Sequence, residues 1–99
     1  MYKYRWIKEE DGKILDIPNL KNEDAKEFEY SVPFSLYRIA EAIGEENIND
    51  WELYDEDNFV VIHVWKDGDL STRERYKICG FEKIEIESSL LEDDEDPDD

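Results

Sequence analysis

A run of eight carboxylates lies between residues 41 and 57 of this 99-residue sequence. No lysine or arginine occurs between Arg38 and Lys66. Carboxylates two residues apart on a strand are about 6.6 Å apart, and each strand of duplex DNA carries one charge for about every 3.4 Å of axis. A rigid row of carboxylates can therefore imitate a row of phosphates and accept charge-assisted hydrogen bonds from arginine and lysine. The eight acids are Glu41, Glu45, Glu46, Asp50, Glu52, Asp55, Glu56 and Asp57.

Two aromatic side chains, Trp51 and Tyr54, lie among these acids. A surface that only keeps a protein soluble needs charge but no aromatic residues, whereas protein interfaces are enriched in tryptophan and tyrosine. We therefore predict a partner-binding surface in which the eight carboxylates provide charge and the two rings are apolar anchors. The alternative is a solvated acidic surface without a partner.

The residues that most often carry out catalysis are scarce. His63 is the only histidine and lies among apolar residues, so we expect a half-buried ring bonded to a neighbour. Cys79 is the only cysteine, and free cysteines are usually buried. A Cys–His pair would require the two to be adjacent across strands, and no third group is indicated. The sequence therefore predicts a protein that is not an enzyme.

Known ligand motifs are also missing. The segments "DEDN" (55–58) and "DGD" (67–69) do not fit the spacing of a calcium loop. The four glycines form no phosphate-binding loop, and one cysteine with one histidine cannot make a zinc site. We expect no cofactor and no specific metal ion.

Basic residues cluster in two places, each of which could be read as a nucleic-acid contact. The simpler interpretation is that they balance acids on neighbouring strands. The remaining surface would repel a polyanion, so direct binding of nucleic acid is not expected. The two clusters are Lys3, Arg5 and Lys8, and Arg73, Arg75 and Lys77.

The net charge of −17 does not come from the C-terminus alone. Without the last eight residues, "EDDEDPDD", 22 acids and 12 bases remain, a net charge of −10. Such a charge attracts basic surfaces and repels anionic membranes. With a single cysteine, no signal peptide and no apolar run of about 18 residues, we expect a cytoplasmic protein, in the host cell if it is viral, with no membrane contact.

The N-terminal half predicts a hairpin followed by a helix. Tyr2, Tyr4 and Trp6 alternate with Lys3, Arg5 and Ile7 in the first strand, Asp11-Gly12 is expected to form a turn and Ile14–Ile17 the returning strand. Residues 19–31 are ambiguous between a helix that begins near Asn22, a short strand at 28–32, and an irregular or extended segment, which we favour. Residues 33–44, "PFSLYRIAEAIG", form the clearest helix, with Pro33 in its first turn and Gly44 as its C-terminal cap.

The C-terminal half predicts four strands joined by tight turns. Residues 51–56 alternate, and residues 59–66 are apolar on both faces, as in a central strand. A turn at Asp67-Gly68 leads to a strand over 71–79, which Gly80 ends, and residues 81–88 form the last strand. The two-sided strand at 59–65 leaves room for a homodimer interface.

Together these elements predict an α+β domain: an antiparallel sheet of five or six strands, in the order β-β-α-β-β-β-β, with one amphipathic helix packed on one face. Residues 1–90 are expected to form a single compact domain. Residues 91–99 are expected to be a disordered acidic tail, since a block of like charges with Pro97 does not fold.

The expected function follows from the charge. In physical type, the chain resembles small acidic inhibitors that imitate DNA, many of them made by phages and mobile elements against restriction, CRISPR or DNA-repair enzymes. This similarity implies a basic nucleic-acid-binding protein as partner. Two alternatives remain open: an immunity or antitoxin protein that neutralises a basic nuclease, and an acidic adaptor or structural component of a larger complex.

Overall fold

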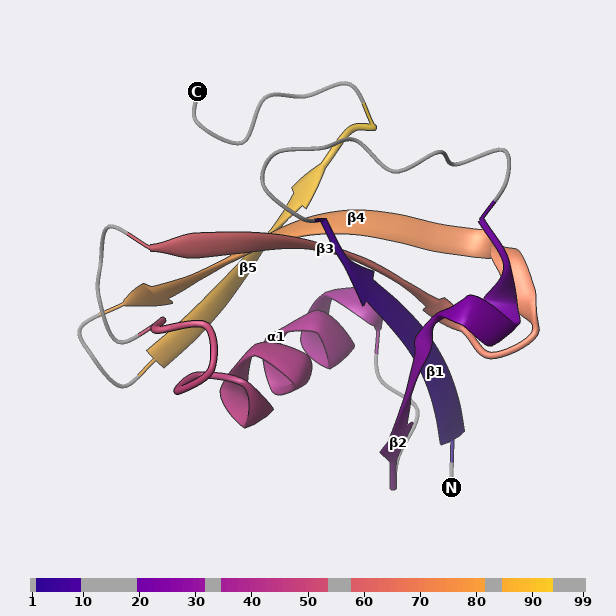
Figure 1. The fold of residues 1–99 in the computed structure, drawn as a ribbon, viewed down its shortest axis with the longest axis horizontal. Helices are drawn as coiled ribbons and strands as arrows, with labels where there is room; N and C mark the ends of the chain where they lie inside the picture. The colour runs from indigo at the N-terminus through magenta and orange to yellow at the C-terminus, as the bar shows by residue number, and fades with distance from the viewer. Residues whose placement is uncertain (1, 10–19, 32–34, 54–57, 82–84, 94–99) are drawn as a thin grey trace.

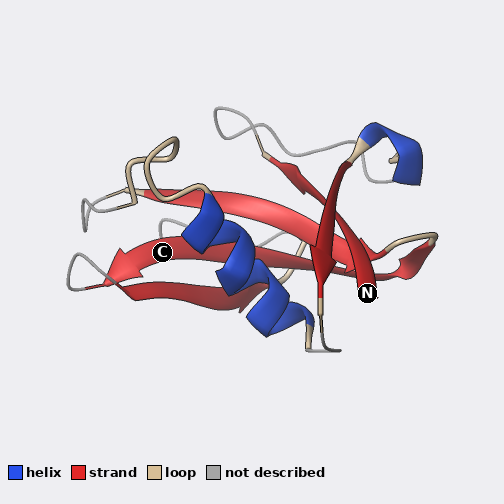
Figure 2. Cartoon of the chain, turned by 90° about the horizontal axis from the view of Figure 1, so that it is seen from below, coloured by secondary structure: helices blue, strands red, loops and turns tan. Residues whose placement is uncertain are grey.

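The computed structural model describes residues 2–9, 20–31, 35–53, 58–81 and 85–93. It confirms the predicted α+β fold: one antiparallel sheet of five strands in the order β2-β1-β3-β4-β5, with one helix across one face (Figures 1 and 2). The elements are β1 (Tyr2–Lys8), a short 3-10 helix (Asn22–Asp24), β2 (Lys26–Tyr30), α1 (Leu36–Glu46), β3 (Phe59–Lys66), β4 (Asp69–Phe81) and β5 (Glu85–Leu91).

Strand β3 is the central strand, as its two-sided apolar sequence predicted. Ile62 and Val64 contribute to the core beneath α1 and are fully buried. On the opposite face His63 and Trp65 are also fully buried within the single chain, and Val61 is nearly so. Burial on both sides explains why this strand has no polar alternation.

The turn at Asp67-Gly68 is confirmed, and Gly68 has a left-handed φ of 83°. The predicted end of β4 at Gly80 is wrong, because the strand continues through Gly80 to Phe81. The last strand also lies later than predicted, over Glu85–Leu91. Ile86 is buried as expected.

Helix α1 begins at Leu36, three residues later than predicted, because Ser35 is its N-cap. The Ser35 hydroxyl accepts a hydrogen bond from the Arg38 amide at 3.4 Å. The predicted cap at Gly44 is wrong. The helix continues to Glu46, and Asn47 is the C-cap.

Gly44 instead allows the helix to approach the sheet closely. A Cβ at this position would lie 2.6 Å from a methyl carbon of Ile78 and 2.8 Å from one of Ile86. A residue with a side chain would therefore not fit at this contact of α1 with β4 and β5. Its role is packing rather than termination of the helix.

The strand predicted at 51–56 is wrong for Trp51–Leu53, which form turns after α1. Leu53 is fully buried, and a Cβ on Gly80 would overlap its carbonyl oxygen. The segment after α1 therefore packs directly against β4 at Gly80, which has no side chain to prevent the contact. Residues 54–57 lie outside the described residues.

The segment before β2 is held by Asn22. Its side-chain oxygen accepts hydrogen bonds from the Trp65 indole at 2.7 Å and the Gly68 amide at 2.8 Å. Its side-chain nitrogen donates to Asp67 at 2.9 Å. Of the alternatives for this region, the short strand comes nearest to the structure, in which Lys26–Tyr30 form β2, two residues earlier than the predicted 28–32.

The strand predicted at Ile14–Ile17 lies outside the described residues. Among those described, the neighbours of β1 are β2 and β3. At the other end, Glu92 and Asp93 follow β5 and contact β4 through arginines, and residues 94–99 are not described. No helix in the described parts of the chain is long and apolar enough to cross a membrane.

Candidate partner-binding surface

The predicted acidic surface begins on the last two turns of α1. The Glu41 side chain is 17 % exposed and lies 3.9 Å from Arg38. Glu45 is exposed and pairs with the same arginine at 3.3 Å. Glu46, Asp50 and Glu52 are exposed and form no ion pair with another described residue. Four predicted site residues lie outside the described part of the chain: Tyr54, Asp55, Glu56 and Asp57.

Two of these acids lie where a helix is least able to tolerate them. Glu45 and Glu46 occupy the last turn of α1, which contains no basic residue. The C-terminal end of a helix carries a partial negative charge, so an exposed acid there costs about 0.3–1 kcal/mol. Arg38 compensates Glu45 in part, and Glu46 has no such partner among the described residues.

The backbone conformation of Glu52 also costs conformational free energy. Its φ of 53° is left-handed, and it is the one non-glycine residue with positive φ among the residues described. A side chain with a Cβ loses roughly 1–2 kcal/mol in this conformation. Glycine or asparagine would be the usual choice, so the carboxylate here is not explained by local folding.

Of the two predicted anchors, Trp51 lies within the described residues and Tyr54 lies outside them. Trp51 is partly exposed, and its ring makes an edge-to-face contact with Trp6, with centroids 5.5 Å apart. The contact ties the acidic turn to the sheet. The ring therefore has a structural partner within the chain, and part of it remains accessible.

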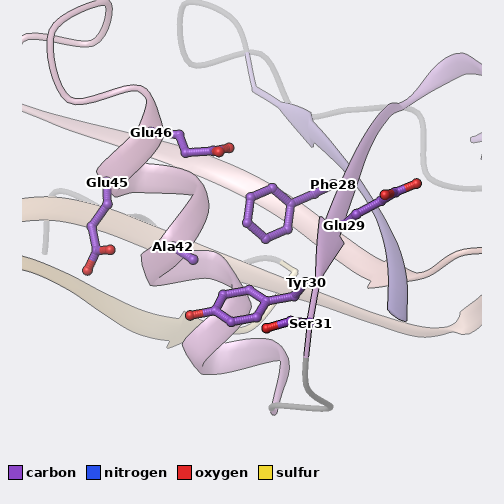
Figure 3. A pocket seen from close by; sticks show the side chains of 7 residues that line it. All are labelled: Phe28, Glu29, Tyr30, Ser31, Ala42, Glu45 and Glu46. Carbon is purple, nitrogen blue, oxygen red and sulfur yellow. The ribbon is translucent and has the colours of Figure 1, made fainter. Parts of the chain in front are cut away.

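A groove that the sequence did not predict lies between α1 and β2 (Figure 3). Phe28 and Tyr30 point from β2 toward the helix, and Ala42 faces them. Glu46 extends from the helix end toward Phe28 (Figure 3). The groove has a volume of about 430 Å³ and is lined by Phe28, Glu29, Tyr30, Ser31, Ala42, Glu45 and Glu46.

The sequence does not predict the groove because residues 19–31 are compatible with a helix, a short strand or an irregular segment. The alternation of Phe28 and Tyr30 with Glu27 and Glu29 is the signal that could have found its apolar wall. The groove brings Glu45 and Glu46 of the predicted surface together with an apolar wall. The other described acids of that surface, Glu41, Asp50 and Glu52, do not line it.

The other polar cluster is on the face of the sheet opposite α1. Glu9 accepts hydrogen bonds from Arg75 at 2.7 and 3.2 Å, and it lies 2.6 Å from Nε2 of His63. Arg73 lies 2.7 Å from Nδ1 of the ring and also donates to Asp93 at 2.7 Å. The expectation that the basic stripe balances acids on neighbouring strands is confirmed for Arg73, whose partner Asp93 follows β5, whereas the acid that pairs with Arg75 follows β1, two strands away.

The hydrogen bonds define the protonation of His63. A guanidinium can only donate, so Nδ1 accepts from Arg73 and Nε2–H donates to Glu9. Burial lowers the pKa of His63, and the Glu9 carboxylate opposes that shift only in part. Burial alone would raise the pKa of Glu9, but its hydrogen bonds from Arg75 and His63 outweigh burial and lower it. The cluster therefore holds a neutral imidazole and an ionised carboxylate.

These shifts predict that the protein loses stability as the pH falls. Below the ordinary histidine pKa of 6.5 the unfolded chain binds a proton that the folded ring does not, so the contribution of His63 is complete above that pH and decreases below it. Glu9 adds a further loss below its ordinary pKa of 4.5. Urea unfolding across roughly pH 5–7 should show a slope of up to about 1.4 kcal/mol per pH unit from His63.

The matched variant for this measurement is His63→Gln, which keeps a donor and an acceptor but cannot titrate. Relief of charge repulsion at low pH acts on both proteins alike, so the difference between their slopes isolates the ring. Equal slopes would show that His63 titrates with an ordinary pKa in the folded protein.

Neither catalytic candidate has the geometry of a reactive pair. His63 is fully buried, rather than half-buried as expected, and its cross-strand partner is Arg75. Cys79 pairs with Phe59, four residues along β3 from the histidine. The expectation of a buried thiol is also wrong, since Cys79 is partly exposed.

The described residues contain no group of three or more histidine, cysteine, aspartate or glutamate side chains arranged to hold a metal ion. What the described surface offers is exposed carboxylates beside an apolar groove, an arrangement suited to binding. Compared with known protein families, with curated proteins and with solved structures, the chain matches none of them.

Proposed function

We propose that the protein is a non-enzymatic acidic inhibitor that occupies the nucleic-acid-binding surface of a basic protein, such as a restriction, CRISPR or DNA-repair enzyme. It would act as a DNA mimic of the phage or mobile-element type, in the cytoplasm of the host cell. Its contact surface consists of the exposed acids at the end of α1 and in the turns that follow, namely Glu45, Glu46, Asp50 and Glu52.

The observation that supports this proposal is that the acids are present where they cost stability. Glu46 opposes the helix dipole without a basic partner in the described structure, and Glu52 has a left-handed backbone. A surface evolved only for solubility could place carboxylates at less costly positions. Costs of this kind are typical of residues retained for function.

The mechanism is electrostatic. A net charge of −17 steers the protein to a basic groove at a rate that falls as the salt concentration rises. Exposed carboxylates on the end of α1 and in the turns that follow can imitate a row of phosphates. Arginine and lysine side chains that bind phosphates would then bind these carboxylates.

The test is retention of DNA-binding proteins from a nuclease-treated bacterial lysate on the immobilised protein, with duplex DNA as competitor. The variant Glu46→Lys/Asp50→Lys/Glu52→Lys should weaken binding of a retained protein at least about 100-fold, at about 1 kcal/mol for each lost contact. The same variant should be more stable by about 0.5 kcal/mol, because Glu46→Lys favours the helix dipole. Weaker binding by a more stable protein cannot be attributed to unfolding.

The control is Asp96→Lys/Asp98→Lys/Asp99→Lys, which changes the net charge equally outside the proposed surface. If both variants lose binding equally, total charge rather than this surface is responsible. Partners that duplex DNA does not displace would contradict DNA mimicry.

A further inference from the structure

We propose that the outer edge of β2, which pairs with no other described strand, binds an extended, lysine- or arginine-rich segment of the partner as an additional strand of the sheet. The inference rests on the proposed function only for the basic character of the partner. It adds a main-chain docking site to a surface otherwise defined by charge.

The hydrogen bonds around β1 show which backbone groups of β2 face outward. The Glu9 amide donates to the Val61 carbonyl at 2.8 Å, and the Asp67 amide donates to the Lys3 carbonyl at 3.1 Å. The odd-numbered residues of β1 therefore bond toward β3. Since the bonding direction alternates along an antiparallel strand, its even-numbered residues bond toward β2.

On β2, the partners of those even-numbered residues are Lys26, Phe28 and Tyr30. The intervening Glu27 and Glu29 direct their N–H and C=O groups away from β1. Strand β2 is the edge of the sheet and has no second neighbour among the described strands. Such an edge is a template for another chain in extended conformation.

The two faces of this edge define the side chains that a docked strand needs. On the helix side, Phe28, Tyr30 and Ala42 wall the groove of about 430 Å³, which suits an apolar side chain (Figure 3). On the opposite side, Glu27 lies 2.8 Å from Arg5, and Glu29 lies 4.0 Å from Lys3. Both carboxylates are about half exposed and can accept a further cation.

Charge complementarity determines the occupant. A docked strand would have Glu27 and Glu29 beside one face and Glu46 near the other. A second copy would bring two chains of net charge −17 together and oppose these acids with each other. In an extended segment with alternating apolar and basic residues, the apolar side chains would face the groove and the basic ones would face Glu27 and Glu29. Basic segments of this kind are expected on nucleic-acid-binding proteins.

The probe is a short synthetic peptide of alternating lysine and valine, titrated into the ¹⁵N-labelled full chain. The largest amide shifts are expected within 26–31 and 42–46. A peptide with the same side chains but N-methyl groups at alternate residues should bind about tenfold more weakly, because it cannot form the main-chain hydrogen bonds.

The protein variants are Glu29→Pro and its matched control Glu29→Thr. Both remove the carboxylate, but only proline removes the outward N–H, and proline is tolerated at an edge position of this kind. Glu29→Pro should bind the peptide about tenfold more weakly than Glu29→Thr. If Glu29→Pro fails to fold, as its own spectrum would show, the N-methylated peptide still tests the proposal with the unaltered protein.

Three results would overturn the proposal: equal binding by the two variants, equal binding of the two peptides, or shifts spread over the acidic surface without a maximum at β2. Concentration-dependent shifts of β2 without peptide would assign the edge to a second copy instead. Failure here is distinct from failure of the proposed function. If one of these three results is found while the unaltered protein still retains proteins that duplex DNA displaces, the mimic stands and only edge docking is wrong.

Discussion

Replacing Glu9 with glutamine is expected to lower the free energy of unfolding by about 3 kcal/mol, a large part of the stability of a domain this size. The side chains of Glu9 and Arg75 are 5 % and 4 % exposed. Arg75 also donates to the Glu92 carbonyl at 2.7 Å, so it cannot leave without breaking a second contact. Loss of the carboxylate charge would leave a buried guanidinium without its counter-ion.

The matched control is Glu27→Gln, and urea unfolding at neutral pH provides the measurement. Glu27 lies 2.8 Å from Arg5, which is almost the same separation, but its side chain is 54 % exposed. Its loss should cost no more than about 1 kcal/mol. Similar losses for the two variants would contradict the view that burial makes the Glu9 pair important.

The second large effect is expected for Gly80→Ala, which should destabilise the protein by about 3 kcal/mol. The new methyl group would overlap the Leu53 carbonyl oxygen, and backbone cannot move aside as a flexible side chain can. Displacement of Leu53, which is fully buried, adds lost burial to the cost of overpacking. The edge-to-face contact of Trp51 with Trp6 should weaken as well, which tryptophan fluorescence can follow.

Gly68→Ala provides the comparison. Gly68 has a positive φ but open space around its missing side chain, so alanine should cost only about 1 kcal/mol. Gly80→Ala should also weaken partner binding, because it displaces Asp50 and Glu52 without changing the net charge. A Gly80→Ala protein as stable as the Gly68→Ala protein would show that Leu53 does not press on β4.

Much of the fold could be predicted because the signals were local. The apolar run at 59–66 identified the central strand, the Asp67-Gly68 turn was found, and the spacing of Leu36, Ile39 and Ile43 identified the helix. These features depend on residues near in sequence. The same reasoning explains why the helix end was wrong: Asn47 caps α1, and neither a glycine nor a base marks that end.

The errors share a tertiary cause. From the sequence, Gly44 is predicted to end a helix and Gly80 to end a strand. In the structure each glycine lies at a close contact that leaves no room for a side chain: Gly44 contacts Ile78, and Gly80 contacts Leu53. The alternation at Trp51–Leu53 looked like a strand because burial of Leu53 against β4 produces the same apolar spacing. Contacts between distant segments decide each case, and no single segment reveals them.

For the candidate surface, the sequence predicts the negative charge but not the groove beside it. The excess of acids is a property of composition, so the sequence displays it directly. The groove depends on β2 lying at the edge of the sheet beside the end of α1, and the buried cluster depends on Glu9 meeting Arg75 across the sheet. Both contacts depend on the order of the strands in the sheet, which cannot be predicted from local sequence patterns.

The strand order also constrains how the chain is made. Strand β1 pairs on one side with β3, joining Tyr4 to Lys66 and Lys8 to Ile62, whereas β3, β4 and β5 are neighbours in sequence as well as in space. During synthesis, β1 cannot pair with β3 until the chain has grown as far as residues 62–66. The closure of so long a loop costs more entropy than the shorter connections between β3, β4 and β5, so these three strands can pair with one another more readily than β1 can pair with β3.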